Sequence, residues 1–346
     1  MTLYERVADL PLVVDDTDLV RAERETSSDF TRVTTTVALH GGGAVGRGED
    51  VTYEATDHEA LLAAPPTLPT GEFTLDAYSA ALDDVDLFPE PPERETARHY
   101  RRWAVESAAL DLALRQAGTN LGAALDRSYD PVRFVASTRL GEAGFERIET
   151  MLAANPALEF KLDPTPEWDA DLVERLADTG RVQVLDLKGY YEGTEVDAEP
   201  DPDLYRLVLE GFPEAVVEDA AFTDATRPVL ADHEDRLAWD YPITGVASVR
   251  ELPVAPRWLN VKPSRFGTVA SLLDFLEHCE AEGIELYGGG QFELGVGRGQ
   301  IQALASLFYP DAPNDVAPAG YNDPEPAGDL PESPLGPSED PAGLGF

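Results

Sequence analysis

The sequence predicts an α/β protein built as a TIM-type (β/α) barrel behind a smaller N-terminal α+β domain. Short apolar runs begin near residue 130 and recur about every 21–33 residues, and most are separated by segments with helical periodicity. No glycine-rich phosphate loop follows the first of these runs, which argues against a doubly wound open sheet, the second candidate fold. The chain has 346 residues, which is enough for a large barrel and one further domain.

Residues 1–125 are expected to form the α+β domain. A β-branched strand over Val33–Leu39 is followed by a turn and by a partner strand over Ala44–Glu49. Helical periodicity favours one helix over Leu75–Leu87 and a longer one over Ala97–Ala117, which Gly118 ends.

Residues 126–322 are expected to form the barrel. Eight strands are predicted, the last more weakly than the others: Val132–Ser137, Ala157–Leu162, Val182–Leu187, Ala215–Glu218, Leu237–Asp240, Trp258–Lys262, Ile284–Gly288 and Asp315–Ala317. The helices expected between them include Glu167–Asp178, Asp203–Gly211, Val269–Glu282 and Gln300–Leu307. Residues 323–346 are rich in proline, glycine and acidic residues, so we expect an irregular tail that packs on the surface, with Leu344–Phe346 docking back onto the protein.

The charge of the chain excludes several classes of partner. It carries 66 acidic and 26 basic residues, a formal net charge of −40, which repels nucleic acid and anionic membranes. The same charge repels itself unless salt screens it, which predicts a cytoplasmic protein of an extreme halophile; an acidic mesophilic protein is the alternative. Cys279 is the only cysteine, so neither an intrachain disulfide nor a multi-cysteine metal site is expected. No apolar run approaches the ~20 residues of a membrane span, and no signal peptide is visible.

Only three of the 26 basic residues are lysines, and all three fall at the predicted ends of barrel strands: Lys161, Lys188 and Lys262. Catalytic groups of a barrel come from the carboxyl ends of its strands. A lysine whose pKa is lowered can act as a base, whereas arginine stays protonated. A lone lysine is usually a solvated surface group, but this placement of every lysine predicts one shared active-site cavity.

Acidic residues end three successive predicted strands, namely Asp186, Glu218 and Asp240. If all three point inward they repel one another unless a cation or protons compensate, and octahedral Mg²⁺ is the natural cation for carboxylate and water ligands. Alternation along a strand also places Lys161 with Asp163, and Asp186 with Lys188, on one face. Taken singly, an acidic residue after a strand is usually a helix N-cap, and the lysines could instead balance part of the acidic charge.

In this order and spacing the residues resemble the enolase superfamily, most closely its muconate-lactonizing and o-succinylbenzoate-synthase-like branch. Gly46–Glu49 is similar to the G-x-G-E turn of the family's capping domain, and Glu106–Leu114 to its A-x-D-x-A helix. Val261–Ser264 resembles the strand-six catalytic lysine with its flanks, and the glycine-rich segment that ends at Glu293 also fits. The resemblance runs over nearly the whole chain and makes the N-terminal α+β domain a capping domain.

The resemblance implies a reaction and its parts. Enzymes of the family abstract a proton α to a carboxylate, while a metal holds that carboxylate and a barrel lysine moves the proton; the superfamily is one of the established examples of tuned acid–base chemistry. Asp186, Glu218 and Asp240 would then bind Mg²⁺, with Mn²⁺ as an alternative. Lys262 would be one acid/base, with Lys188 or Lys161 on the opposite face of a small carboxylate substrate. The expected enzyme is a lyase or an isomerase, acting by racemisation, dehydration or cycloisomerisation.

Three positions depart from the family pattern. The strand-two K-x-K motif reads Lys161-Leu162-Asp163, the strand-three D-x-N motif reads Asp186-Leu187-Lys188, and Tyr241 replaces the acid of the strand-five D-E pair. Lys188 could supply the amine lost from strand two, with Asp163 as its ion-pair partner. Alternatively, its ammonium occupies the metal site, and the protein is a metal-free or non-catalytic homologue that only binds a small anion. Standard o-succinylbenzoate synthase activity is disfavoured, and both the substrate and the oligomeric state, a homo-oligomer included, stay open.

Overall fold

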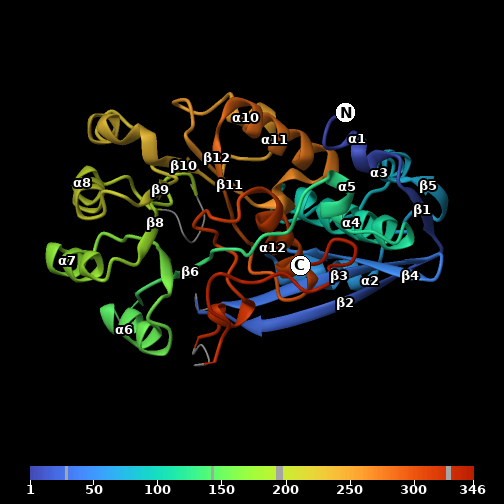
Figure 1. Ribbon diagram of the computed structural model, residues 1–346, viewed down its shortest axis with the longest axis horizontal. Coiled ribbons are helices and arrows are strands. Elements are labelled where there is room, and N and C mark those ends of the chain that lie inside the picture. The colour runs from blue at the N-terminus through green and yellow to red at the C-terminus, as the bar shows by residue number, and fades with distance from the viewer. Residues whose placement is uncertain (28–29, 142–143, 192–197, 325–328) are drawn as a thin grey trace.

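The computed structural model describes residues 1–27, 30–141, 144–191, 198–324 and 329–346. In Figure 1 the N-terminal part of the chain, drawn in blue to cyan, lies at one end of the molecule and the barrel strands with their helices lie at the other. All predicted site residues fall among the described residues, whereas residues 325–328 of the expected tail fall outside them.

The N-terminal part contains two small antiparallel sheets. The three-stranded sheet has the order β2-β3-β4, with β2 over Asp16–Glu25, β3 over Thr31–Gly41 and β4 over Ala44–Asp50. The second sheet pairs β1 (Pro11–Val14) with β5 (Gly71–Thr74). The short helices of this part are α1 (Glu5–Ala8), α2 (Ala55–Ala63) and α3 (Leu75–Leu82).

The long helix α4 (Ala97–Gln116) joins this part to the barrel and buries most of its side chains. Strand β4 lies directly against it, because Gly46 and Gly48 leave no side chain between them: a Cβ at Gly48 would overlap the carbonyl oxygen of Ala104. The two glycines of the G-x-G-E segment therefore allow a sheet backbone to touch a helix backbone. After α4 comes the short α5 (Leu121–Leu125), which Asn120 caps through the Ala123 N–H.

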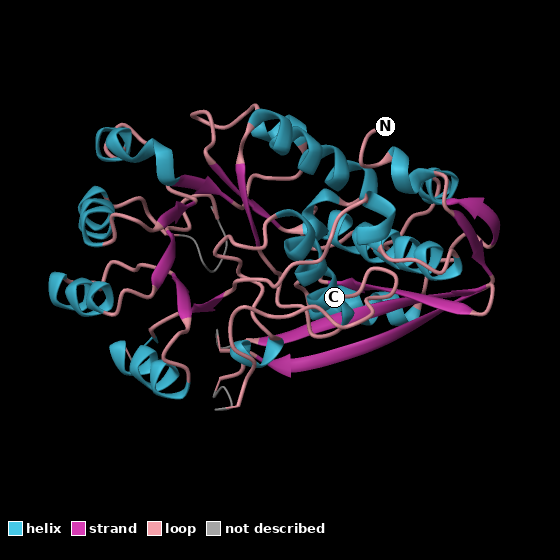
Figure 2. Ribbon diagram, in the orientation of Figure 1, coloured by secondary structure: helices cyan, strands magenta, loops and turns pink. Residues whose placement is uncertain are grey.

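Seven parallel strands form the curled sheet visible in Figure 2 and follow one another in chain order: β6 (Val135–Thr138), β7 (Glu159–Leu162), β8 (Val182–Asp186), β9 (Val216–Glu218), β10 (Leu237–Trp239), β11 (Trp258–Val261) and β12 (Glu285–Gly288). The weakly predicted eighth strand forms only isolated bridges, in which Asn314 pairs with Phe134 and Asp315 pairs with Gly289. These bridges connect the two edge strands, because Phe134 directly precedes β6 and Gly289 directly follows β12. Asn314 also accepts the Gly288 N–H through its side chain, at 2.6 Å.

Helices cover the outer face of the parallel sheet: α6 (Phe145–Ala154), α7 (Ala170–Asp178), α8 (Pro202–Gly211), α9 (Arg227–Leu230), α10 (Val246–Val249), α11 (Val269–Glu282) and α12 (Val296–Phe308). Short 3₁₀ segments cover Ala231–Arg236, Pro263–Phe266 and Ala319–Asn322. Two predicted helices are shorter than expected. The predicted Glu167–Asp178 helix begins at Ala170, because the Asp169 side chain accepts the Leu172 N–H and so marks its N-cap. The predicted Leu75–Leu87 helix ends at Leu82.

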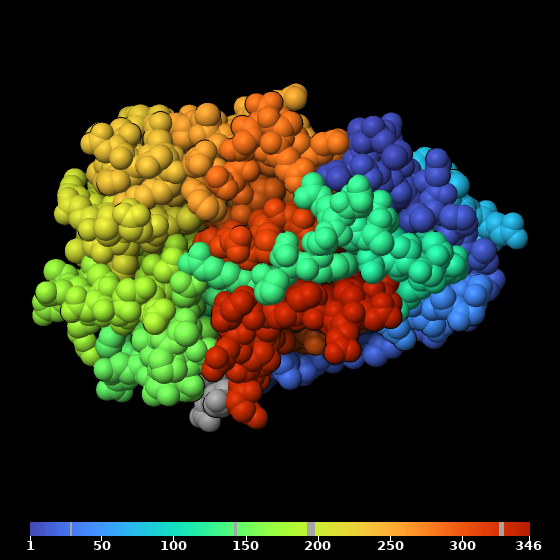
Figure 3. All heavy atoms as spheres, in the orientation of Figure 1, coloured from blue at the N-terminus to red at the C-terminus, as the bar shows by residue number. Residues whose placement is uncertain are grey.

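The C-terminal residues, drawn in red, lie across the surface beside the green segment that follows α4 (Figure 3). Leu344 is buried and donates its backbone N–H to Asp111 of α4, and Gly343 bridges Asn120. Among the described residues, no helix is both long enough and apolar enough to cross a membrane.

Candidate active site

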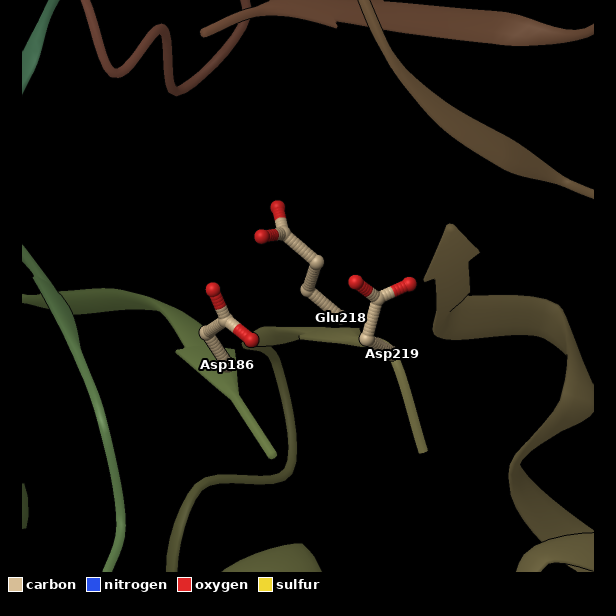
Figure 4. A group of neighbouring side chains, drawn as sticks. All are labelled: Asp186, Glu218 and Asp219. Carbon is tan, nitrogen blue, oxygen red and sulfur yellow. The ribbon is translucent and has the colours of Figure 1, made fainter. Parts of the chain in front are cut away.

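Three carboxylates gather at the carboxyl ends of neighbouring strands β8 and β9, belonging to Asp186, Glu218 and Asp219 (Figure 4). One oxygen from each lies within 4.8 Å of the others, and all three residues are buried. Like charges this close cannot all persist in a buried site unless cations or protons offset them. The neighbouring side chains therefore decide what this layer can bind.

Lys161 of β7 supplies one of these cations from the interior of the barrel. Its ammonium bonds Glu218, lies 3.1 Å from Asp186 Oδ2 and lies 3.9 Å from Asp315 Oδ2. Burial alone would lower the pKa of Lys161, but the Glu218 and Asp186 carboxylates outweigh it and raise the pKa well above its ordinary value. Lys161 is thus held as an ammonium ion.

Lys188 supplies a second cation from the loop after β8. Its ammonium bonds the Asp186 carboxylate, lies 3.5 Å from Asp163 Oδ1 and stands 5.1 Å from the centre of the Tyr191 ring. Burial again opposes the charge, but Asp163 and Asp186 raise the pKa of Lys188 above its ordinary value. Burial would raise the pKa of Asp186 too, yet Lys188 and Lys161 together hold it well below its usual range.

Asp240, which follows β10, is held by a different set of donors. Its Oδ2 lies 2.7 Å from Lys262 Nζ and accepts from Tyr191 Oη at 2.9 Å and from Arg265 Nη2 at 3.3 Å. Burial is outweighed by Arg265 and Lys262, which lower the pKa of Asp240 below its ordinary value. Its other oxygen, Oδ1, is buried and has no hydrogen-bond partner among the described residues. A buried carboxylate oxygen without a partner is uncommon and marks a position that a cation or a water can fill.

Glu218 accepts from three donors that converge on it. Besides Lys161, Tyr287 Oη of β12 donates to its Oε2, and Asn260 Nδ2 of β11 donates to the same oxygen at 2.9 Å. Burial nevertheless raises the pKa of Glu218 well above its ordinary value, because Lys161 only partly opposes it and the nearby Asp186 and Asp240 charges add to it.

Asp219 enters the site by an unusual backbone conformation. Its φ of 51° is left-handed, so the residue after Glu218 does not point to the opposite face as it would in a continuing strand. Its two oxygens accept the backbone N–H groups of Asp240 and Tyr241 at 2.9 and 3.0 Å. Burial and the charges of Asp240 and Asp186 raise the pKa of Asp219 to about 7. Asp219 therefore fixes the end of β10, and its raised pKa indicates negative charge that the local cations do not fully offset.

Glu49 connects the N-terminal part to the loop beside the site. Its buried carboxylate accepts the N–H groups of Leu294, Gly295 and Gly297, at 2.7 to 3.0 Å, at the start of α12. An anion there offsets the positive end of the helix dipole. The loop that leads into α12 also touches the site, because a Cβ at Gly289 would lie 2.8 Å from Lys262 Cε.

The predicted site residues divide into two groups in space. Lys161, Lys188 and Asp163 meet around Asp186, whereas Lys262 meets Asp240. The predicted metal set of Asp186, Glu218 and Asp240 stays a prediction, because the close carboxylate group contains Asp219 in place of Asp240. Sequence reasoning missed several partners of these residues: Asn260, Arg265, Tyr191, Tyr287, Asp219 and Asp315. Only Arg265 could have been found from the sequence, because it follows the predicted catalytic Lys262 by three residues; the structure places it in the 3₁₀ segment after β11.

The donor chemistry of the site fits a magnesium ion. Carboxylate oxygens are its preferred protein ligands, and Asp240 Oδ1 is available without breaking an existing bond. Asp186 and Glu218 provide two further carboxylates on adjacent strands. Two ammonium groups compete for the same place, because Lys188 already bonds Asp186 and Lys161 bonds Glu218 and lies 3.1 Å from Asp186 Oδ2.

Comparison with known protein families assigns the chain to one of them. A family model described as the N-terminal domain of a domain of unknown function, DUF8230, matches residues 5–124, and its C-terminal counterpart matches residues 128–323. The chain belongs to the DUF8230 family. The boundary between the N-terminal and C-terminal family matches lies at the end of α5.

Individual relatives resemble the chain over both the barrel and the N-terminal domain. The chain is 24% identical over 243 residues to o-succinylbenzoate synthase from Bacillus subtilis (strain 168), an alignment that covers 66% of this chain and only 62% of that protein. Dipeptide epimerase from Enterococcus faecalis V583 superposes with a TM-score of 0.72 at 17% identity, over 96% of this chain and 99% of that one. Dipeptide epimerase from Methylococcus capsulatus, complexed with Mg ion, gives 0.61 at 19% identity over 96% and 99%. The chain thus has the fold of the enolase superfamily, a capping domain followed by a barrel.

Proposed function

We propose that this protein is an enolase-type enzyme that abstracts a proton α to the carboxylate of a small acid, assisted by Mg²⁺ or Mn²⁺, as a racemase, dehydratase or cycloisomerase. The observation that carries the proposal is the buried layer in which Lys161, Lys188 and Lys262 meet carboxylates at the strand ends of this fold. A site with fixed ammonium groups of this kind suits a substrate that gains negative charge during the reaction.

Asp186, Glu218 and Asp240 would hold the metal. When bound, the metal supplies Lewis-acid stabilisation of charge on the substrate carboxylate. The unpartnered Asp240 Oδ1 supports this assignment, whereas Asp219 is less suited because both of its oxygens already accept backbone N–H groups.

The three lysines would have different roles in proton transfer. Lys262 directly follows β11, forms an ion pair with Asp240 and is the proposed acid/base. Lys161 and Lys188 have raised pKa values, so they would remain ammonium ions that stabilise negative charge or donate a proton. Asp163 would tune Lys188 through their ion pair.

Deuterium exchange tests the proton transfer. We expect a panel of small carboxylic acids incubated in D₂O with the protein and Mg²⁺ to include one that gains α-deuterium, detected by mass spectrometry. Lys262→Ala should abolish this exchange, while Arg98→Met, an exposed cation of α4, should leave it unchanged. Exchange that survives Lys262→Ala would remove Lys262 from the mechanism.

A metal-free binding protein is the second candidate, and the Lys188–Asp186 contact favours it. In that case the ammonium stands permanently where the metal would bind, and the barrel only holds a small anion. Calorimetric titration of the purified protein with Mg²⁺ and Mn²⁺ separates the two, because a protein that binds neither cation cannot use the metal-dependent reaction.

A further inference from the structure

Lys188 shares a single carboxylate oxygen with another lysine. Asp186 Oδ2 accepts the Lys188 ammonium and lies 3.1 Å from Lys161 Nζ. The two ammonium groups repel each other, and each one bound to Asp186 reduces the attraction left for the other. A divalent cation on Asp186 would be a third positive group at the same carboxylate, so one ammonium would have to leave.

Lys161 is poorly placed to leave. Its side chain is only 2% exposed, and it also bonds Glu218, the register partner of Asp186 on β9. Moving it would take the ammonium partner away from the buried Glu218, which is costly.

Lys188 is well placed to leave. Its side chain is 17% exposed, and its backbone, with a left-handed φ of 55°, has already left the strand direction of β8. A second carboxylate, Asp163, lies 3.5 Å from its ammonium. Asp163 is held in place by Arg139, whose Nε donates to its other oxygen at 3.0 Å. The ammonium therefore has a fixed alternative partner within reach.

We propose that the Lys188 ammonium is an intramolecular competitor for the cation site, and that a divalent cation displaces it from Asp186 onto Asp163. This inference rests on the magnesium site proposed above. It makes Lys188 a residue that sets the cation affinity of the site, since binding must first break the Lys188–Asp186 ion pair. Asp163 lowers that cost by accepting the displaced ammonium.

Calorimetric titration with Mg²⁺ tests the competition without any substrate. Lys188→Asn should bind Mg²⁺ about tenfold or more tightly than the wild type, because the lost ion pair is a charge-assisted hydrogen bond. Lys188→Arg keeps the charge and should bind as weakly as the wild type. Arg206→Met, which removes one positive charge from the exposed face of α8, should leave the affinity within about twofold of wild type.

Asp163→Asn gives a second test with the opposite sign. It removes the alternative partner of Lys188, so Mg²⁺ should bind more weakly than in the wild type. In the Lys188→Asn background the same substitution should have little further effect. A general effect of lost negative charge would instead weaken binding equally in both backgrounds. Because Asp163→Asn leaves Lys188 in place, this test stands even if Lys188→Asn fails to fold, which circular dichroism would reveal.

The outcomes separate the inference from the proposed function. If the wild type and Lys188→Asn bind Mg²⁺ equally, the inference is wrong and the magnesium site stands. If Lys188→Asn alone binds, Lys188 blocks the site and does not yield it to a cation, so the displacement and the metal-assisted function are both overturned. If neither binds, both fail. Equal tightening by Lys188→Arg and Lys188→Asn would also overturn the inference, because charge would not be the cause.

Discussion

Arg101 is a buried cation that holds part of the capping domain together. Its Nε donates to Asp50 Oδ2 at 2.7 Å, its Nη2 donates to the Asp57 carbonyl at 2.9 Å, and its guanidinium stacks 3.8 Å from the Phe88 ring centre. We expect Arg101→Met to reduce the free energy of unfolding by about 3–5 kcal/mol, because Asp50 is then a buried charge without its main partner. Guanidinium chloride denaturation measures this change.

Arg98 of the same helix provides the matched control. It pairs with Glu95 at 2.9 Å but is 45% exposed, so Arg98→Met should cost about 0–1 kcal/mol. Equal losses from the two variants would show that the burial of Arg101 does not matter.

His58 should make stability depend on pH. Its Nε2 donates to the Thr52 carbonyl, its Nδ1 accepts from Thr35 Oγ1, and burial lowers its pKa despite the attraction of Asp50. Since the folded pKa is the lower one, the unfolded chain binds the proton first as pH falls below about 6.5. Stability should therefore decrease below that pH, by at most ~1.4 kcal/mol per unit from this group.

Denaturation at pH 8, 7, 6 and 5 measures the effect against His58→Gln. The variant cannot titrate, so its stability should fall less between pH 7 and pH 5 than that of the wild type. The protein also loses stability in acid through Asp50, because Arg101 outweighs burial and lowers the pKa of Asp50, but that loss begins only near pH 4. Parallel curves for the two proteins between pH 7 and pH 5 would contradict the role of His58.

At the level of single residues, the sequence predicted which lysines and acids lie at the strand ends better than it predicted which of them contact one another. Lysines and acids at strand ends could be read from alternation along each strand. Lys188 and Asp219 lie beyond the point where alternation applies, because both have left-handed backbones. A left-handed non-glycine residue has no reliable sequence signature, so the position of Asp219 in the site required the structure. The contacts of Lys188 with Asp163 and with Asp186 were both alternatives that the sequence offered, and the structure contains both.

At the scale of elements, the glycines of β4 control how the strand meets α4. A Cβ at Gly48 would overlap the Ala104 carbonyl oxygen and also reach Ser107 Oγ. Gly48→Ala should therefore push β4 away from α4 and destabilise the protein by about 1–3 kcal/mol. Because Glu49 follows Gly48, the amides at the start of α12 should also exchange with deuterium faster.

Gly299 of α12 is the matched control for this substitution. Nothing lies within 4 Å of a Cβ placed there, so Gly299→Ala should stabilise the helix by up to ~1 kcal/mol. Thermal unfolding of the two variants checks the opposite signs, and destabilisation by both would indicate that loss of glycine flexibility, and not contact with α4, is responsible.

The barrel strands were predictable because both of their faces are buried, which makes them continuous apolar runs. Strand β2 was not predicted: its sequence is mostly polar, and its residues are half-buried or exposed on the edge of the three-stranded sheet. The eighth strand has a weak sequence signal, and the structure contains no regular strand among the described residues at that position. The side chain of Asn314 and two bridges replace a regular ladder there.

At the scale of the whole molecule, net charge opposes folding. The formal charge of −40 must be brought into a compact volume, while the unfolded chain can spread it out. On one helix this is visible locally: Glu174 and Asp178 of α7 are exposed acids four residues apart, and Asp178 stands at the negative end of the helix dipole.

We therefore expect the free energy of unfolding to rise as KCl increases from 0.1 M to 1 M, where the Debye length shortens from about 10 to 3 Å. Urea denaturation at fixed temperature measures it, since urea adds no charge of its own. Salts also strengthen apolar burial, and that contribution would be the same in a less acidic variant. Glu174→Gln/Asp178→Asn should be more stable than the wild type at 0.1 M KCl and should gain less stability between 0.1 and 1 M. If both proteins gain equally, screening of surface charge is not what salt supplies, and the prediction of a halophilic protein loses its physical basis.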